Sequence, residues 1–345
     1  MSGQLSPEQL RQGFTEQVQP YLEMNRGGDT SVSPPRFISV GGQPGAGKSG
    51  ALRQAKRDNP GAVIVNGDEL RQFHPAYPQV MATDPLSMPE VTAQAAGQWV
   101  GMSNQWLREQ QISAVVETTL RQPAVLLREF EAFHDAGYVT ELRVVAVPVE
   151  VSRLGTLTRY IEQIQDFGAG RAVTTQGHDV PATAVPSTVE ALVASGLVDR
   201  LVIQDRDGRA FLDLDVSQGG PELAAQAREM VDQTRDVASM TPQQAQNWFQ
   251  IATNTLTALE DAPLDQDLLQ VSAQLATRDA KAIAARAWPT EPEMQRHQVD
   301  VLQHHHWAAV RAATLTRPSS RTTGLRPRHR STPSRPDHGH GGPER

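Results

Sequence analysis

The sequence predicts an α/β protein in which a mostly parallel sheet is sandwiched between helices. Three observations predict this fold class. Apolar, strand-like segments alternate with helix-like segments between residue 37 and about residue 215. The first of these strands runs directly into a glycine-rich loop, "GGQPGAGKS". Beyond residue 216 only helix-like segments follow, which predicts an all-helical C-terminal extension.

The elements are expected in a regular order. A helix is expected over residues 7–24, because Leu10, Phe14, Val18 and Leu22 recur near one helix face. Five strands are expected at "FISV", "AVIVNGD", "ISAVVETT", "ELRVVAVPV" and "RLVIQDRDGRAFLD". The helices between them are expected from about Lys48 and at "TAQAAGQWVGMSNQWLREQ", "PAVLLREFEAFHDAG", "EVSRLGTLTRYIEQIQDFG" and "STVEALVASG". A polar loop is expected before the last of these helices.

The chain is predicted to have three parts: a nucleotide-binding domain over 1–215, a helical extension over 216–316 and a disordered tail over 317–345. The tail is rich in Arg, Pro, Gly and Ser and has little apolar surface to bury. In the extension, His304, His305 and His306 suggest a metal site. Consecutive residues do not share a helix face, so a solvated histidine run is preferred.

Composition limits the classes of partner. The formal net charge is −7, and the tail contributes seven Arg against two acidic residues, so the body of the chain is strongly acidic. An acidic body argues against nucleic acid as a partner, because that affinity comes largely from cations that displace counterions. The chain has no cysteine and no apolar run long enough to span a membrane. We therefore expect a cytoplasmic protein.

The glycine-rich loop is the strongest functional signal. It reads Gly42-x-x-x-x-Gly47-Lys48-Ser49 between a strand and a helix, the pattern of a P-loop NTPase. Its glycines let the backbone wrap phosphate oxygens, Lys48 would reach the β- and γ-phosphates, and the Ser49 hydroxyl would join the Mg²⁺ shell. The predicted nucleotide-binding residues are Gly42, Gln43, Pro44, Gly45, Ala46, Gly47, Lys48, Ser49 and Gly50.

Two acidic residues follow neighbouring strands at the edge where such sheets bind ligands. Asp68 comes after "AVIVNG", and it could cap the next helix or accept the proton of an acceptor hydroxyl during phosphoryl transfer. Glu117 ends "SAVVE" and could bind substrate hydroxyls, hold magnesium-bound water, or merely cap a helix. The residues alone do not decide between these roles.

Two arginines lie between the fourth and fifth predicted strands. Arg159 is in "GTLTRYIEQ" and Arg171 is in "DFGAGRAVTTQGHDVP". A single Arg on a helix is usually a solvated surface residue. Phosphoryl transfer, however, spreads negative charge over the γ-phosphate oxygens, and an Arg delivered in cis contributes about 10³ to 10⁵ in rate. A flexible segment here would suit a lid that carries such residues.

Taken together, these segments resemble the zeta-toxin family of P-loop kinases, which phosphorylate the 3′-hydroxyl of the amino sugar in UDP-N-acetylglucosamine and related UDP-sugars. The matching segments are "GGQPGAGKS", "VIVNGDELRQFHP", "VVETTLRQP", "TLTRYIEQ" and "GRAVTTQGHD", in that order, within residues 8–215. The first is generic, whereas the second and third are much more specific. The helical extension lies outside the resemblance.

The resemblance implies a role for each matching residue. Lys48 would bind the nucleotide phosphates, Asp68 would be the base on the acceptor hydroxyl, and Arg159 with Arg171 would stabilise the transferred charge. Glu117, Thr119 and Arg121 would contact the sugar nucleotide. The implied cofactors are ATP or GTP with Mg²⁺. The implied partner is a small antitoxin protein that covers the nucleotide site.

Two alternatives remain open at this point. A kinase of the same fold could act on another hydroxyl, for instance that of an antibiotic. A nucleotide-dependent binding protein could instead use hydrolysis to drive an interaction, with the helical extension and the Arg-rich tail as contact surfaces. The identity of the phosphoryl acceptor would distinguish the UDP-sugar kinase from the first alternative. The effect of Asp68→Asn would distinguish it from the second alternative.

Overall fold

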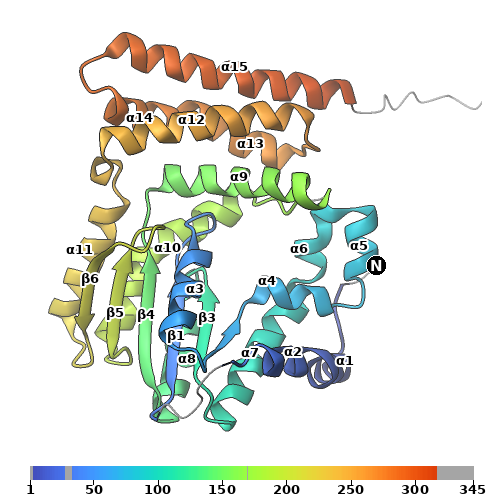
Figure 1. Ribbon diagram of the computed structural model, residues 1–345, viewed down its shortest axis with the longest axis vertical. Coiled ribbons are helices and arrows are strands. Elements are labelled where there is room, and N and C mark those ends of the chain that lie inside the picture. Colours follow the sequence, from blue (N-terminus) through green and yellow to red (C-terminus); the bar gives the residue numbers. More distant parts are fainter. Residues whose placement is uncertain (1–2, 28–32, 169, 317–345) are drawn as a thin grey trace, which may run out of the picture.

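The computed structural model describes residues 3–27, 33–168 and 170–316, and a mixed six-stranded sheet forms its centre (Figure 1). The strand order is β2-β3-β1-β4-β5-β6. The first five strands are parallel, and β6 is antiparallel to β5. The strands are β1 Arg36–Gly41, β2 Val63–Val65, β3 Ala114–Thr118, β4 Val139–Val145, β5 Arg200–Gln204 and β6 Ala210–Asp215. The predicted fold class is confirmed, while the tail at 317–345 lies outside the described residues.

The central strand β1 sets the position of the glycine-rich loop. Its last residue, Gly41, is in register with Thr118 of β3 and Val144 of β4. The carboxyl ends of three neighbouring strands therefore meet at the loop, as expected for a parallel sheet. Alternate side chains of β1 enter opposite cores: Ile38 packs on one face, and Phe37 stacks on Phe133 on the other.

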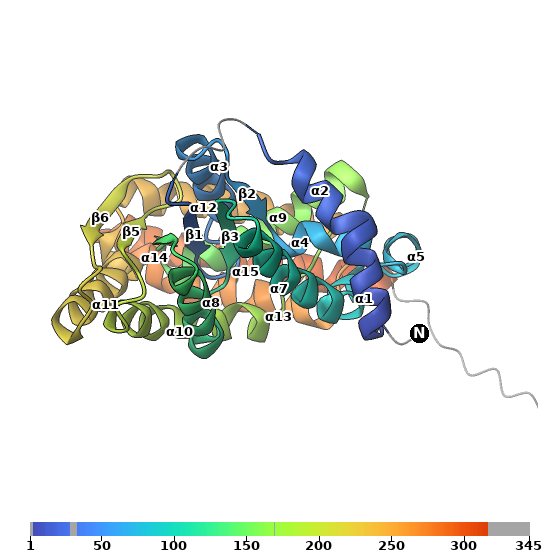
Figure 2. The ribbon, with the colours of Figure 1, turned by 90° about the horizontal axis from the view of Figure 1, so that it is seen from below.

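Helices cover both faces of the sheet (Figure 2). On one face α3 buries Ala51, Leu52 and Ala55 against β1. The opposite face carries the larger core, to which α8, α10 and α11 contribute. The helices of this part are α3 Lys48–Asp58, α4 Gly67–Leu70, α5 Tyr77–Thr83, α6 Met88–Val91, α7 Ala93–Glu109, α8 Pro123–Asp135, α9 Val149–Phe167, α10 Thr175–Ala194 and α11 Pro221–Arg235.

The predicted N-terminal helix over 7–24 is confirmed with one irregularity. It consists of α1 Pro7–Gly13, a π-helical turn Phe14–Val18 and α2 Gln19–Met24. Ser6 caps it, accepting a hydrogen bond from Gln9 N. Leu10, Phe14, Val18 and Leu22 are buried as the spacing predicts, and they join the larger core.

Two local predictions are wrong. The segment "RLVIQDRDGRAFLD" forms a hairpin of β5 and β6 rather than one strand, because the turn at 205–209 reverses the chain. The polar loop before "STVEALVASG" is shorter than expected, since α10 already begins at Thr175. Thr174 caps this helix by accepting from Gly177 N, and buried apolar residues hold it in place despite Pro181 and Pro186 in its interior.

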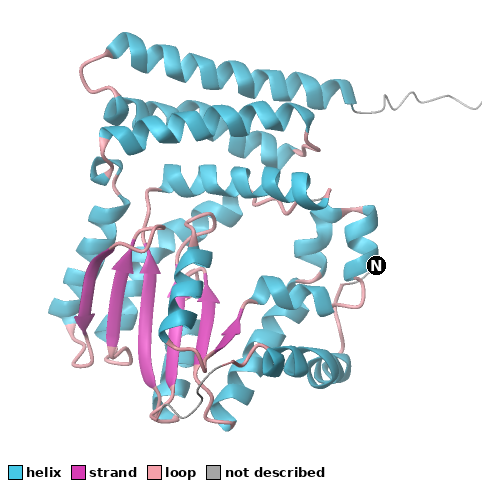
Figure 3. Cartoon of the chain, viewed as in Figure 1, coloured by secondary structure: helices cyan, strands magenta, loops and turns pink. Residues whose placement is uncertain are grey.

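The C-terminal extension is a helical layer stacked on α9, beyond the carboxyl edge of the sheet (Figures 1 and 3). It shares a second core with Leu154, Leu157 and Tyr160 of α9. By contrast α11, which follows the predicted boundary at 216, packs into the core of the sheet. We therefore propose that the extension begins with α12. Its helices are α12 Pro242–Ala258, α13 Gln266–Gln274, α14 Ala280–Ala287 and α15 Pro292–Thr316.

The histidine run lies on α15. His304 is exposed, but His306 is buried, and its Nδ1 lies 2.9 Å from Ser272 Oγ. The prediction of a solvated run is therefore wrong for His306, because α15 turns that side chain towards α13. No helix in the described part of the chain combines the length and the apolar character of a membrane span.

Candidate functional site

The glycine-rich loop has a backbone that requires its glycines. Gly45 and Gly47 have φ values of 76° and 97°, in the left-handed region that favours glycine. At Gly45 an added Cβ would lie 2.0 Å from the carbonyl oxygen of Ser152, so the loop also lies tightly against α9. Lys48 and Ser49 begin α3, whose amino terminus points its free N–H groups at the loop. The geometry is that of an anion-binding cradle.

Lys48 is the buried cation of this cradle. Its Nζ donates to the carbonyl oxygens of Gly42 (2.8 Å) and Gln43 (3.2 Å) and lies 3.6 Å from Glu117 Oε1. Burial lowers the pKa of Lys48, and the nearby carboxylates of Glu117 and Asp68 oppose that shift. An incoming phosphate would supply the negative charge that a buried ammonium group requires.

Asp68 lies at the centre of a cluster of guanidinium groups. It is ion-paired with Arg171, with Arg71 (3.2 Å) and, at longer range, with Arg159 Nη2 (3.8 Å). Burial alone would raise the pKa of Asp68, but the positive charges, that of Arg171 foremost, outweigh burial and lower the pKa to about 2. The carboxylate is therefore fully ionised at neutral pH.

Asp68 does not have the alternative role of capping the helix that follows β2. The residue that caps α4 is Asn66, whose Oδ1 accepts from Asp68 N at 2.9 Å. The side chain of Asp68 is therefore available to form ion pairs with the surrounding arginines. Asp68 of α4, Arg159 of α9 and Arg171 of the segment before α10 thus meet within one site, as expected from the sequence.

The end of β3 and the residues after it form the neighbouring part of the site. Glu117 is half-buried and faces Lys48, which places it beside the cradle. Thr119 is half-buried and Arg121 is exposed, two and four residues further along the chain. Neither is among the described residues that line the cavity at the cradle. The structure therefore brings Glu117 to the loop and leaves Thr119 and Arg121 farther along the same edge.

The donor set fits a magnesium ion shared with a nucleotide. Mg²⁺ in nucleotide sites is held by one or two protein oxygens together with substrate phosphates and water. Ser49 presents an exposed hydroxyl at the start of α3, and the Glu117 carboxylate lies across the cradle. In the described residues no three His, Cys, Asp or Glu side chains gather to hold a metal by themselves.

Sequence reasoning missed residues that support the loop. Arg206, in the turn after β5, donates from Nη2 to the carbonyl oxygen of Gly45 at 3.0 Å. Gln43 is buried, and its amide donates to the carbonyl oxygen of Val147 (2.9 Å) and to Ser152 Oγ (3.3 Å). The "DRDG" turn signal would have revealed the hairpin that carries Arg206. Nothing in the sequence pattern indicates the contacts of Gln43.

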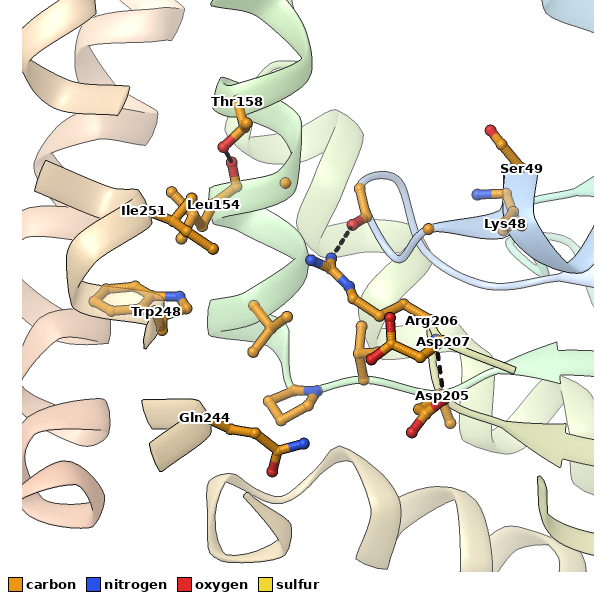
Figure 4. Close-up of a pocket in the computed structure, with 18 of the residues that line it drawn as sticks. Lys48, Ser49, Leu154, Thr158, Asp205, Arg206, Asp207, Gln244, Trp248 and Ile251 are labelled. Atoms are coloured by element: carbon orange, nitrogen blue, oxygen red, sulfur yellow. Dashed lines mark hydrogen bonds between the residues drawn. The ribbon is translucent and has the colours of Figure 1, made fainter. Parts of the chain in front are cut away.

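A cavity of about 780 Å³ opens from the cradle. Figure 4 shows Lys48 and Ser49 on one side of it, Arg206 in the middle, and Gln244 and Trp248 of the helical extension on the other side. Arg159 of α9 also lines it. Its volume lies within the range of about 300–1,000 Å³ typical of small-molecule sites.

Comparisons with known proteins find relatives of this chain. The chain is 27% identical over 198 residues to Toxin zeta of Streptococcus pyogenes, covering 56% of this chain and 69% of that protein. It is 29% identical over 188 residues to Toxin PezT of Streptococcus pneumoniae serotype 4, covering 54% and 74%. A solved structure from the PezAT chromosomal toxin-antitoxin system of Streptococcus pneumoniae has a similar fold, with a TM-score of 0.54, 22% identity, and coverage of 68% of this chain and 98% of that one. The zeta toxin family model matches residues 22–216, and the chain therefore belongs to the zeta toxin family.

Proposed function

We propose that this protein is an ATP- or GTP-dependent kinase that phosphorylates the 3′-hydroxyl of the amino sugar in UDP-N-acetylglucosamine or a related UDP-sugar. The observation that carries the proposal is the ionised Asp68, held beside Arg159 and Arg171 within the electrostatic reach of the cradle lysine, Lys48. A base, two cations for developing charge and a phosphate cradle are the parts that phosphoryl transfer to a hydroxyl requires.

In the proposed reaction Asp68 accepts the proton of the sugar hydroxyl while that oxygen attacks the γ-phosphorus. The new bond joins the sugar oxygen to phosphorus, the bond between phosphorus and the β–γ bridging oxygen breaks, and the nucleoside diphosphate leaves. Lys48 binds the β- and γ-phosphates, and Arg159 and Arg171 stabilise the negative charge on the transferred group. Magnesium, held by Ser49 and the phosphates, would neutralise phosphate charge.

Asp68 is well suited to bind the acceptor but is a weak base in the resting arrangement. With a pKa of about 2 it has little affinity for a proton. A bound γ-phosphate would compete for Arg159 and Arg171 and draw their charge away from the carboxylate. The proton affinity of Asp68 would then rise when the substrate is in place.

The family relationship supports a role as the toxin of a toxin-antitoxin pair. The matching relatives are named as toxins, and the structural neighbour belongs to a toxin-antitoxin system. We propose that a small antitoxin protein covers the nucleotide site of this chain. Transfer of phosphate to UDP-amino sugars would make the protein toxic by withdrawing a precursor of peptidoglycan.

The decisive experiment is an acceptor panel. Wild-type protein is incubated with Mg·ATP or Mg·GTP and a set of UDP-sugars, and products are identified by mass spectrometry. The proposal expects phosphorylated UDP-N-acetylglucosamine from the wild type and near-complete loss of product from Asp68→Asn, with nucleotide affinity nearly unchanged. Product from an antibiotic alone would identify the chain as a kinase of another hydroxyl. Wild-type transfer by Asp68→Asn would remove Asp68 from its assigned role.

A further inference from the structure

The cavity at the cradle extends past the part of the chain that defines the family. Its lining runs from Lys48 and Ser49 across Arg206 to Gln244, Trp248 and Ile251 of α12. The zeta toxin family model ends at residue 216. The side of the cavity formed by Gln244, Trp248 and Ile251, called the α12 wall below, therefore belongs to the helical extension. Figure 4 shows these α12 side chains across the cavity from Lys48 and Ser49.

The α12 wall offers an apolar surface. Ile251 is 44% exposed, although it is a large aliphatic residue, and it lines the cavity. Phe211 of β6 is exposed and lines the same cavity. The indole of Trp248 is fixed beneath, because its Nε1 donates to the carbonyl oxygen of Glu150 at 3.1 Å. Large exposed apolar side chains that share a concave site mark a ligand surface.

Polar groups of α12 lie beside this apolar surface. Gln244, Asn247 and Ile251 are spaced three and then four residues apart and therefore share one helix face. The Oε1 atom of Gln244 accepts from Thr241 N in the helix cap, which orients the side-chain amide. Gln244 and Asn247 both line the cavity, and amides carry donors and acceptors suited to the edge of a heterocyclic base.

The position of the α12 wall suits the nucleoside end of a bound nucleotide better than it suits the phosphoryl acceptor. Of the proposed acceptor residues, Asp68 follows β2 and Glu117 lies in β3, on one side of β1 in the sheet. Arg206 and Phe211 belong to β6 and the turn before it, on the opposite side of β1. A nucleotide with its phosphates on the central loop therefore directs its base towards the β5–β6 side and α12.

We propose that α12 of the helical extension forms the nucleobase pocket, with Ile251 against the face of a purine and Gln244 and Asn247 at its edge. The ligand class is a purine nucleoside triphosphate. The inference rests on the nucleotide binding of the proposed function but not on the identity of the acceptor. It makes the extension part of the nucleotide site rather than an appendage.

The test compares two ligands on one variant. ATP would contact both the cradle and α12, whereas inorganic tripolyphosphate would contact the cradle alone. In full-length Ile251→Gln we expect the Kd for ATP, measured by calorimetry, to rise at least about tenfold, because a polar group replaces an apolar wall. The Kd for tripolyphosphate should stay at the wild-type value. The matched control is Val180→Gln, which changes a residue of α10 that is 45% exposed and outside the cavity lining.

The outcomes separate this inference from the proposed function. Unchanged ATP affinity in Ile251→Gln, or equal weakening of both ligands, would overturn the α12 pocket even if UDP-sugar phosphorylation is found. Normal ATP binding by the wild type without transfer to any acceptor would overturn the kinase proposal and leave the pocket intact. A wild type that binds tripolyphosphate but not ATP overturns the pocket. A second variant, Asn247→Ala, should weaken ATP severalfold without weakening tripolyphosphate.

Discussion

The carboxylate of Asp68 is ion-paired with the guanidinium group of Arg171, a residue 103 positions later in the chain. The proposed mechanism gives the two residues different partners, a sugar hydroxyl for Asp68 and a phosphate for Arg171. In the absence of both substrates they satisfy each other. The pair keeps a partly buried negative charge and a partly buried positive charge compensated until phosphate binds.

The first prediction concerns Arg171. In Arg171→Ala we expect the transfer rate to fall by about 10³ or more, since an arginine that stabilises transferred charge contributes that much. Nucleotide affinity should change far less, because Lys48 and the loop remain. Single-turnover kinetics with saturating Mg·ATP and UDP-N-acetylglucosamine measure the effect. A loss confined to KM would instead make Arg171 a binding residue.

The second prediction concerns the cradle lysine. Lys48→Met should weaken ATP binding by about tenfold or more, because hydrogen bonds to a charged group contribute about 1.5–3 kcal/mol. The matched control is Lys56→Met, eight residues along α3, where Nζ donates to the carbonyl oxygens of Pro60 and Ala62 rather than facing the cradle. Calorimetric titration with ATP compares the two. Equal affinity in both variants would exclude Lys48 from phosphate binding.

The sequence predicted the sheet and the edge of the sheet at which the candidate residues lie, because both depend on local patterns. A glycine-rich loop after an apolar strand, and acidic residues after neighbouring strands, place Lys48, Asp68 and Glu117 at one edge of a parallel sheet. The pairing of Asp68 with Arg171 depends on α9 and on the turn before α10, whose path no local pattern fixes. The wall on α12 was missed for the same reason. Its spacing at 244, 247, 248 and 251 is that of any amphipathic helix, and only the packing of the extension on α9 brings this face to the loop.

The third prediction concerns the backbone of the cradle. Gly45→Ala forces an alanine to φ 76° and drives its Cβ to 2.0 Å from Ser152 O. The left-handed conformation costs about 1–3 kcal/mol, and displacement of the loop from α9 adds to that cost. Chemical denaturation should show a lower free energy of unfolding. In the control Gly97→Ala, on α7 with no atom within 4 Å of the new Cβ, stability should rise by about 0.5–1 kcal/mol.

The fourth prediction concerns pH. Burial lowers the pKa of His178 below its usual 6.5, while Asp179 opposes the shift through a hydrogen bond to Nδ1. Between the two pKa values, the imidazole of His178 is protonated in the unfolded chain and neutral in the folded protein. The contribution of His178 to the free energy of unfolding is therefore lost as pH falls below 6.5. The effect of Asp279 on the pH dependence of stability has the opposite sign. Burial raises the pKa of Asp279 to about 6 and outweighs the positive charge of Arg153, which acts to lower that pKa.

The histidine effect is therefore measured as a difference. The free energy of unfolding of wild type minus that of His178→Asn should decrease between pH 7.5 and pH 5.5, and Asp279 cancels because it is common to both proteins. Urea denaturation at several pH values gives this difference. A difference that does not change with pH would show that His178 titrates in the folded protein as it does in the unfolded chain.

The last prediction concerns the ion pair that fastens the extension to the site. Arg153 on α9 donates from Nη1 to both carboxylate oxygens of Asp279, at 2.6 and 2.5 Å, and from Nη2 to Asp179 at 2.7 Å. Both Arg153 and Asp279 are almost completely buried. Asp279→Ala leaves a buried guanidinium group with one partner fewer and should lower the free energy of unfolding by about 3–5 kcal/mol.

The same variant tests whether the extension positions α9, the helix that carries Arg159. Glu190→Ala, which breaks an exposed pair with Arg228, should leave the stability almost unchanged and serves as the control. Because α9 also carries Arg159, loosening it should lower the transfer rate of Asp279→Ala at a temperature where the variant is still folded, while tripolyphosphate binding to the loop is retained. If Asp279→Ala is destabilised but transfers phosphate at the wild-type rate, the extension stabilises α9 without setting the position of Arg159.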